Sequence, residues 1–356
     1  MSETAERTPA VAGKPPRSPA PANGAWRLLR ASGTFLLRQR ELTVFVVVVL
    51  LILYFGVISS TGRAVFFEKA DLINLGQIAA PIIIIALGEV LLLICGEIDI
   101  SVGFIYAFTP FIMYFLIQYY GVPGILAIIL ALVCAAAIGW VNAFITVTIG
   151  VPSFITTLGT GFVLYGLILT MAHGEQAPVS PQVLGIGHWL GTYAFAEIIW
   201  AVALVALFHV LLRRTRWGLH TIAVGGNQLG SAEAGVNVAR IKYGNFMITA
   251  VLGGFVGIQI AFQTNVIDTF SGGAAYQPMF YAVAAAVLGG TSMLGGSGTM
   301  IGAFLGAAVL TILQDGFAVL GISAYPLEIF FGGAILISMI ASVQLARLRA
   351  GGRIKR

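Results

Sequence analysis

Long apolar runs alternate with short polar segments along most of the chain. Each run is roughly the 20 residues that an α-helix needs to cross the hydrocarbon core of a bilayer. The pattern therefore predicts an all-α polytopic membrane protein with about ten transmembrane helices. The expected helices are residues 43–60, 72–95, 100–119, 123–149, 153–171, 193–212, 243–263, 278–292, 298–320 and 326–345.

The polar segments divide the chain into a membrane domain and two tails. Residues 1–40 are rich in Ala, Pro and Arg, which predicts a disordered basic tail. The first apolar run comes too late for a cleavable signal and is long enough to remain as an anchor. Residues 41–346 form the predicted membrane domain, and residues 347–356 form a second basic tail.

The basic residues predict the orientation of the chain. Residues 213–242 are the long polar interruption between the apolar runs, and they carry Arg213, Arg214, Arg216, Arg240 and Lys242. Threading the helices back and forth places this loop and both tails on one side, with only Arg63 and Lys69 opposite. By the positive-inside rule the loop and both termini are cytoplasmic. Helices two to five and seven to ten then have opposite topology, which allows an inverted repeat.

Composition excludes a water-soluble globule. Hydrophobic residues make up 58% of the chain, charged residues only 9%, and the mean hydropathy is +0.96. The net charge of +5 sits in short blocks between apolar runs, which fits orientation in a bilayer better than a nucleic-acid surface. Cys95 and Cys134 lie inside apolar runs and are interpreted as small buried hydrophobic residues.

Three acids, Glu89, Glu97 and Asp99, lie in the stretch GEVLLLICGEIDISVG at the end of the second run and the start of the third. Unpaired charge there is costly, and no Lys or Arg in the apolar segments is available as a partner. One interpretation is structural: Gly96 ends one helix, and Asp99 or Ser101 caps the next. The other is a proton or ion relay. Gly103 closes the segment.

A second unusual stretch, GGTSMLGGSGTMIGAFLG, is rich in glycine but lacks the lysine and spacing of a phosphate-binding loop. It predicts a tight turn followed by a face of small residues at Gly298, Gly302 and Gly306, which would pack inside the chain or between two copies. The turn residues are Gly289, Gly290, Thr291, Ser292, Gly295, Gly296 and Gly298.

The remaining polar residues of the apolar runs show no metal-ligand spacing and no catalytic triad, so no catalytic or metal site is predicted. Four of them would suit a path for a hydroxylated solute, although such residues commonly make interhelical hydrogen bonds instead. These pathway candidates are Asn142, Gln259, Gln263 and Gln314.

Three stretches in this order resemble the permease subunits of ATP-binding-cassette importers for monosaccharides of the ribose, xylose and arabinose type. GEIDISVG resembles the family's G-x-I-D-L-S-V-G segment, with Glu97 where a second Gly is usual. IAVGGNQLGSAEAGVNVARIK resembles its cytoplasmic loop, but the usual E-A-A-R after Gly-Gly-Asn is replaced, which puts a charge contact to the ATPase in doubt. The third is the stretch AAAVLGGTSMLGGSGTMIGAFLGAAVLTILQDGFAVLGIS.

The resemblance implies a non-catalytic subunit of an ATP-driven importer in the bacterial inner membrane. Its partners would be a cytoplasmic ATPase that binds ATP and Mg²⁺, a second permease subunit and an extracytoplasmic sugar-binding protein. No cofactor in this chain and no nucleic-acid partner are implied. Residues 213–242 would be the coupling loop, with contacts carried over to Arg216, Gly218, Gly225, Gly226, Asn227, Glu233, Gly235, Asn237 and Val238.

Two other classes of function remain. A secondary transporter or channel would use the acids of the apolar segments, Glu89, Glu97, Asp99 or Asp315, as its coupling site. A membrane-embedded hydrolase or transferase would need a convergent set of nucleophile, base or metal ligands, which the sequence lacks. The sequence does not identify the sugar or polyol.

Overall fold

The computed structural model describes residues 40–59, 62, 65–269 and 276–322, together with six single residues between 329 and 340. Helices account for nearly all of this part. In chain order its elements are α2 (Arg40–Leu53), η1 (Tyr54–Ile58), α4 (Lys69–Ile94), α5 (Val102–Gln118), α6 (Gly124–Ala143), η2 (Phe144–Ile149), α7 (Ser153–Ala172), β1 (Ala177–Pro178), η3 (Pro181–Val183), α8 (Leu184–Gly187), η4 (His188–Thr192), α9 (Ala196–Arg214), α10 (Arg216–Gly226), α11 (Gln228–Glu233), α12 (Val238–Thr264), β2 (Val266–Ile267), α13 (Tyr276–Leu288) and α14 (Met300–Val319).

The structure confirms an α-helical polytopic membrane protein. In the described part, seven helices are long and apolar enough to cross a membrane, and α5 and α13 are shorter apolar helices. The nine predicted runs up to residue 320 each correspond to one of these helices. The prediction of an all-α fold needs one small correction: Ala177–Pro178 and Val266–Ile267 pair as antiparallel strands.

Three predicted segments lie outside the described residues, wholly or for the most part. They are the tail 1–40, the tenth run, 326–345, and the tail 347–356. Only Arg40 of the first tail, which begins α2, and six residues of the tenth run are described. The number of spans, the sides of the termini and the inverted repeat therefore stay predictions.

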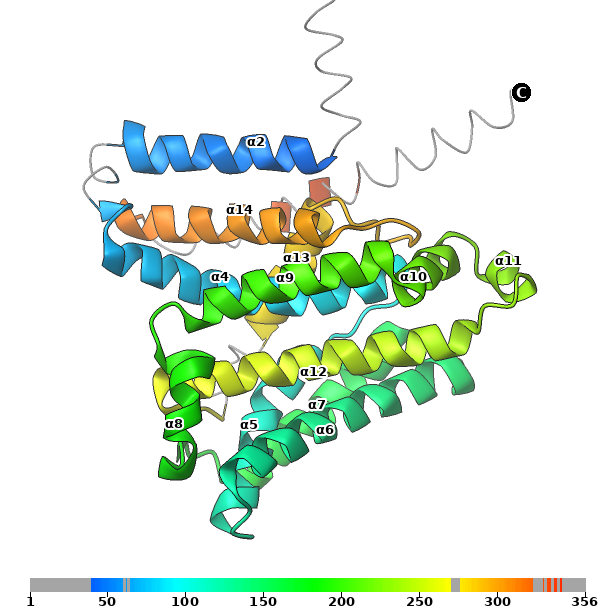
Figure 1. The fold of residues 1–356 in the computed structure, drawn as a ribbon, viewed down its shortest axis with the longest axis horizontal. Coiled ribbons are helices and arrows are strands. Elements are labelled where there is room, and N and C mark those ends of the chain that lie inside the picture. Colours follow the sequence, from blue (N-terminus) through cyan, green and yellow to red (C-terminus); the bar gives the residue numbers. More distant parts are fainter. Residues whose placement is uncertain are drawn as a thin grey trace, which may run out of the picture. The chain divides into compact units, whose positions relative to one another are not determined.

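Two helices, α4 and α12, form the centre of the bundle. In their most apolar windows α4 is 83% buried and α12 is 72% buried, against 28% for each of α7, α9 and the span Gly124–Ile149. α12 packs against α4, α5 and α6, while α4 also packs against α9, α13 and α14. Figure 1 shows α2 alongside α14 at one edge of this arrangement, and α6 with α7 at the other. The outer helices expose their apolar side chains, as lipid contact or a partner subunit requires.

The bundle has two distinct ends, which Figure 1 shows at opposite sides. We call the end that carries α10 and α11 the basic end, because it follows Arg213 and Arg214 at the end of α9. We call the other the strand-pair end, because β1 and β2 pair there beside the last turn of α12.

Candidate functional site

Three segments far apart in sequence meet at the basic end, around the last carbonyl of α4. The Gly296 N–H donates a hydrogen bond to the Ile94 carbonyl oxygen over 2.8 Å. A Cβ placed on Gly225, near the end of α10, would lie 1.6 Å from the same oxygen and 2.8 Å from the Gly296 nitrogen. Only glycine therefore fits at position 225. We call this contact of Ile94, Gly225 and Gly296 the glycine junction.

The turn between α13 and α14 supplies one side of the glycine junction. Gly290, Gly295 and Gly296 have φ angles of 93°, 85° and 79°, a region that glycine adopts without strain. The turn is tied to itself by a bond from the Ser292 N–H to the Ser297 carbonyl oxygen, 2.8 Å. The predicted tight turn is thus present. Its tip approaches the backbone of α10, since a Cβ on Gly296 would be 3.2 Å from the Gly226 Cα.

The small-residue face that follows the turn packs within the chain. A Cβ on Gly302 would lie 2.2 Å from the Gly289 carbonyl oxygen, and one on Gly306 would lie 2.1 Å from that of Ala285. Both contacts bring α14 against α13. Gly298 faces the side chains of Ile94 and Thr291 instead. Of the two arrangements left open by the sequence, this face makes the intramolecular one.

Helix α10 is held to the bundle core by a hydrogen-bonded asparagine of α12. The Asn245 Oδ1 accepts a bond from the Trp217 indole N–H over 2.9 Å, and its amide nitrogen donates to the Leu91 carbonyl at 3.3 Å and to the Thr221 hydroxyl at 3.4 Å. Asn245 is fully buried. It therefore connects α10 to both central helices. Trp217 was not among the predicted coupling residues, although a tryptophan beside the basic Arg216 is a visible signal.

The predicted coupling loop folds as two short helices whose starts are capped. Thr215, Asn227 and Asn237 are the N-caps of α10, α11 and α12, and each accepts a bond from a backbone N–H three residues on. Gly235 lies between α11 and α12 with a φ of 84°. Of the other predicted loop residues, Gly218 is buried against the end of α9, and Val238 packs in a cluster with Cys95 and Val224. Arg216 and Glu233 are exposed. Gly225 has no room for a side chain, whereas its neighbour Gly226 has open space beside it.

The segment between α4 and α5 is joined to the start of α12 by an ion pair. The Lys242 Nζ lies 2.6 Å from the Glu97 Oε1, and the two side chains are only 10% and 13% exposed. This corrects the expectation that no lysine or arginine is available to partner these acids. The sequence places Lys242 in the polar loop, but α12 begins at Val238, so Lys242 lies in the first turns of this helix and can reach Glu97.

Asp99 lies at the centre of a buried hydrogen-bond network before α5. Its Oδ1 accepts bonds from the Ser101 N–H at 2.9 Å and from the Ser101 hydroxyl at 2.5 Å. The Asn142 amide of α6 donates to the Ser101 Oγ at 2.8 Å, and the Thr160 hydroxyl of α7 donates to the Asn142 Oδ1 at 2.7 Å. Ser101 is the N-cap residue of α5, but its own side chain makes no capping bond. Asp99 thus orders the helix start and ties α5 to α6 and α7.

The rest of the signature segment has the geometry of a helix end. α4 ends at Ile94, and Gly96 follows with a φ of 76°, the conformation of a glycine that closes a helix. Gly103 is buried in the first turn of α5. Glu89, the third acid, is fully buried inside α4, and neither carboxylate oxygen has a hydrogen-bond partner among the described residues.

The four pathway candidates do not lie together. Asn142 belongs to the Asp99 network, and the Gln259 amide donates to the Leu190 carbonyl at 3.1 Å. Two cavities, of about 290 and 270 Å³, lie toward the strand-pair end; Gln263 lines neither of them, whereas Gln314 lines the second. The described residues contain no group of three or more His, Cys, Asp or Glu that could hold a metal ion.

A multi-pass bundle with a glycine junction at one end, cavities toward the other and two short helices after the exposed Arg213 and Arg214 has the organisation of a membrane protein of the transport class. The family described as the permease component of branched-chain amino acid transport systems matches residues 72–340, and the chain belongs to this family. A permease component is the membrane subunit of its transport system, which accounts for the lack of a catalytic constellation in the sequence.

Named relatives agree with this assignment. The xylose/arabinose import permease protein of Sulfolobus acidocaldarius is 36% identical over 87% of this chain and 86% of its own length. A probable ABC transporter permease protein of Escherichia coli is 32% identical over 86% and 90%. The ribose import permease protein of Escherichia coli is 31% identical over 86% and 94%. No solved structure matches the chain.

Proposed function

We propose that this chain is the membrane subunit of an ATP-driven importer for a monosaccharide or a similar small hydroxylated solute. ATP and Mg²⁺ are bound by a separate cytoplasmic ATPase, and an extracytoplasmic binding protein delivers the solute at the strand-pair end. A second permease subunit, by default another copy of this chain, completes the pathway. The basic end and both termini face the cytoplasm, and the membrane is the bacterial inner membrane.

The observation that carries this proposal is the glycine junction. Two of the three stretches that resemble the monosaccharide permeases contribute Gly225 and Gly296, and both contact Ile94, which lies two residues before the remaining stretch, GEIDISVG. The relatives whose names include xylose, arabinose and ribose support a sugar as the solute. A helix locked by backbone contacts moves with its neighbours as one body, so a push on α10 reaches α4 and α14.

The surface of α10 and α11 suits an ATPase as the partner that delivers this push. Leu229 of α11 is 72% exposed and Leu219 of α10 is 54% exposed, and Arg213, Arg214 and Arg216 are exposed at the end of α9 and the start of α10. Exposed apolar side chains on a segment that also carries exposed arginines have the composition of a protein interface, in which the apolar part is buried and the polar rim stays wet.

Isolation of the chain from detergent-solubilised native membranes tests the proposal. We expect a two-domain ATPase to co-purify, with ATPase activity in the eluate. Proteoliposomes that contain both chains and the binding protein should take up sugar only when ATP is supplied. Sugar uptake by the purified chain alone, without ATP or a second subunit, would refute the proposal.

A secondary transporter is the second candidate, and two buried acids favour it. Glu89 and Glu197 are 0% and 2% exposed, and none of their carboxylate oxygens has a hydrogen-bond partner among the described residues. Buried acids of this kind occur in proton relays. This candidate predicts uptake that an ionophore abolishes and that ATP depletion leaves intact, which is the reverse of the importer's behaviour.

A further inference from the structure

Two aspartates of different helices meet at the strand-pair end of the bundle. Asp71 lies in the first turn of α4 and Asp315 lies near the end of α14, and their carboxyl groups are hydrogen-bonded to each other. We call these two residues the aspartate pair. We propose that the aspartate pair is a binding site for one proton, which the two carboxyl groups share, and that the bound proton joins α4 to α14.

The hydrogen bonds of the aspartate pair require this proton. Asp315 is 1% exposed, and its Oδ1 accepts a bond from the Asn74 amide at 2.8 Å. The Oδ2 atoms of Asp71 and Asp315 are buried, and no N–H or O–H group of the described residues donates to them. Because an ionised carboxylate only accepts hydrogen bonds, two of them can bond to each other only when one carries a proton.

Aromatic side chains cover the α14 side of the aspartate pair. Gly316 follows Asp315 and lies against Phe55, since a Cβ on Gly316 would be 2.6 Å from that ring. Phe66 stacks on Phe55 with ring centroids 6.5 Å apart, and both side chains are at most 2% exposed. Figure 1 shows α14 between α2 and α4 at this edge of the bundle. Aromatic rings cannot solvate a second negative charge as water does, so these surroundings favour a proton on the pair.

The chain next to Asp71 does not supply a positive charge to the pair. Lys69, the first residue of α4, is exposed and forms no ion pair with either aspartate. Glu68, which precedes it, is also exposed and adds a negative charge beside Asp71. The ion pair that the described residues do form joins Lys242 to Glu97 at the basic end. Within the described part of the chain, the aspartate pair therefore has a like charge beside it and no ionic partner.

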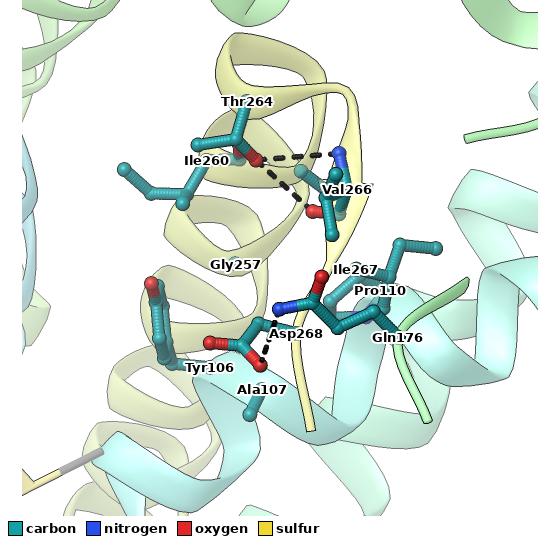
Figure 2. Close-up of a pocket in the computed structure, with 11 residues that line it drawn as sticks. Tyr106, Ala107, Pro110, Gln176, Gly257, Ile260, Thr264, Val266, Ile267 and Asp268 are labelled. Atoms are coloured by element: carbon teal, nitrogen blue, oxygen red, sulfur yellow. Dashed lines mark hydrogen bonds between the residues drawn. The ribbon is translucent and has the colours of Figure 1, made fainter. Parts of the chain in front are cut away.

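The charged and titratable groups of the neighbouring helices lie elsewhere. α2 carries Arg40 and Glu41 in its first turn, far from η1, and α12 carries its charges in its first turns at the basic end. α13 brings Tyr281 and no charged residue, and α9 brings Glu197, a buried acid without a hydrogen-bond partner among the described residues. Figure 2 shows Asp268 at a cavity lined by residues of α5 and α12 but not by α4 or α14. These acids have a pH dependence of their own, so a test of the aspartate pair compares variants at the same pH.

Loss of the proton turns the contact between α4 and α14 into a repulsion. Two negative charges would then lie within hydrogen-bond reach in a largely buried place, where water screens them little. The proton-bound form therefore stabilises the folded chain at low pH, and this contribution is lost as the pH rises. In the orientation proposed above, this end faces the outside, so the joint responds to the external pH.

The thermal midpoint of the purified full chain in detergent, measured from about pH 5 to about pH 8, tests the joint. Asp71→Asn replaces the shared proton by an amide N–H, which can donate to Asp315 at every pH. We expect the parent chain to match Asp71→Asn at the lower pH and to have a midpoint at least about 2 °C below that of Asp71→Asn at the higher pH. Asp71→Ala offers no donor and should have a lower midpoint than Asp71→Asn throughout.

Asp268→Asn is the matched control, because it makes the same exchange at an exposed position of the same end. Its midpoint should follow that of the parent chain at every pH. A difference between the parent chain and Asp71→Asn that stays constant with pH would overturn the inference. So would a parent chain that gains stability over Asp71→Asn as the pH rises, since two ionised carboxylates held by a cation behave in that way.

Infrared spectroscopy of the folded chain detects the proton directly, through the C=O stretching band of a protonated carboxylic acid. Because the pair carries one proton, we expect Asp71→Asn and Asp315→Asn each to remove the same band at the lower pH. Asp268→Asn should leave that band in place. An unchanged carboxylic acid spectrum in both pair variants would overturn the inference, whatever their thermal midpoints.

Both measurements separate this inference from the proposed function, because neither depends on ATP, on a partner chain or on sugar uptake. A chain that proves not to belong to an ATP-driven importer would leave the proton site in place. A constant midpoint difference together with unchanged infrared bands would remove the proton site and leave the importer in place.

Discussion

Substitution of the two adjacent glycines at the end of α10 provides a matched test of the glycine junction. Gly225 and Gly226 occupy the same helix end, and replacing either by alanine improves intrinsic helix propensity by about 1 kcal/mol. Their surroundings differ completely. A Cβ on Gly225 would lie 1.6 Å from the Ile94 oxygen, whereas one on Gly226 would meet nothing within 4 Å. Only Gly225→Ala should therefore disturb the junction.

The expected cost follows from the contact distances. An ordinary contact between carbon and a carbonyl oxygen is about 3.3 Å, so Gly225→Ala requires a displacement of about 1.7 Å between α10 and α4. Such overpacking costs about 1–3 kcal/mol. The hydrogen bond from Gly296 to Ile94, now 2.8 Å, adds about 1 kcal/mol if it is lost. After the gain in helix propensity, the junction is weakened by about 1–3 kcal/mol, a factor of roughly 5 to 150 in a two-state equilibrium.

Uptake and ATPase activity in proteoliposomes are the measurements that check this. Gly225→Ala should retain the partner ATPase, for which we propose a contact with the outer surface of α10 and α11, yet lower sugar uptake per ATP hydrolysed at least fivefold. Gly226→Ala should match the parent chain in both. Parental coupling in Gly225→Ala, at an equal amount of membrane-inserted protein, would show that the close approach seen at Ile94 has no role in transport.

Three further predictions concern the segments around the junction. Glu97→Gln should leave the Lys242 ammonium without an ionised partner in a largely buried place, which lowers the free energy of unfolding by about 3–5 kcal/mol and the thermal midpoint of the purified chain. The double exchange Glu97→Lys with Lys242→Glu should restore part of the thermal midpoint, and no recovery would argue against the ion pair. Asp99→Asn keeps an acceptor for the Ser101 N–H and should support uptake, while Asp99→Leu should not; equal loss in both would point to a required negative charge. Gly235→Pro cannot adopt a φ of 84° and should abolish uptake without preventing membrane insertion, as fractionation and immunoblotting would report. Unchanged uptake in Gly235→Pro would remove that turn from the coupling mechanism.

Helix positions were predictable because the apolar periodicity of a membrane protein is set by the bilayer itself. The run predicted at 153–171 is α7, Ser153–Ala172, and that at 298–320 is α14, Met300–Val319. Boundaries failed where polar residues continue a helix beyond its apolar run. α12 begins at Val238, not at residue 243, because Asn237 caps it, and the polar turn that follows carries Lys242.

The glycine junction could not be predicted, because local sequence does not report which backbones touch. Gly225 and Gly226 are indistinguishable in the sequence, yet only one of them lies against Ile94. The same holds for the polar residues of the helices. Asn142 and Gln314 were equivalent candidates for a solute path, but Asn142 is engaged with Ser101 and Thr160, and only Gln314 faces a cavity. In both examples, contacts with residues of other helices determine the environment of the residue, and the local sequence does not report these contacts.

Helix α4 connects the glycine junction to a cavity toward the other end of the bundle. Gln77 lines this cavity and Ile94 belongs to the glycine junction, and 17 residues of helix separate them, a rise of about 26 Å. The part of α4 from Ala79 to Ile94 is almost entirely buried, so it moves only together with its neighbours. Pro81 interrupts the backbone bonding at the cavity end, where a bend of α4 requires the least loss of hydrogen bonds. A displacement of α10 against Ile94 is therefore expected to reach this cavity as a tilt of α4 about Pro81, which changes the distance between Gln77 and Gln314.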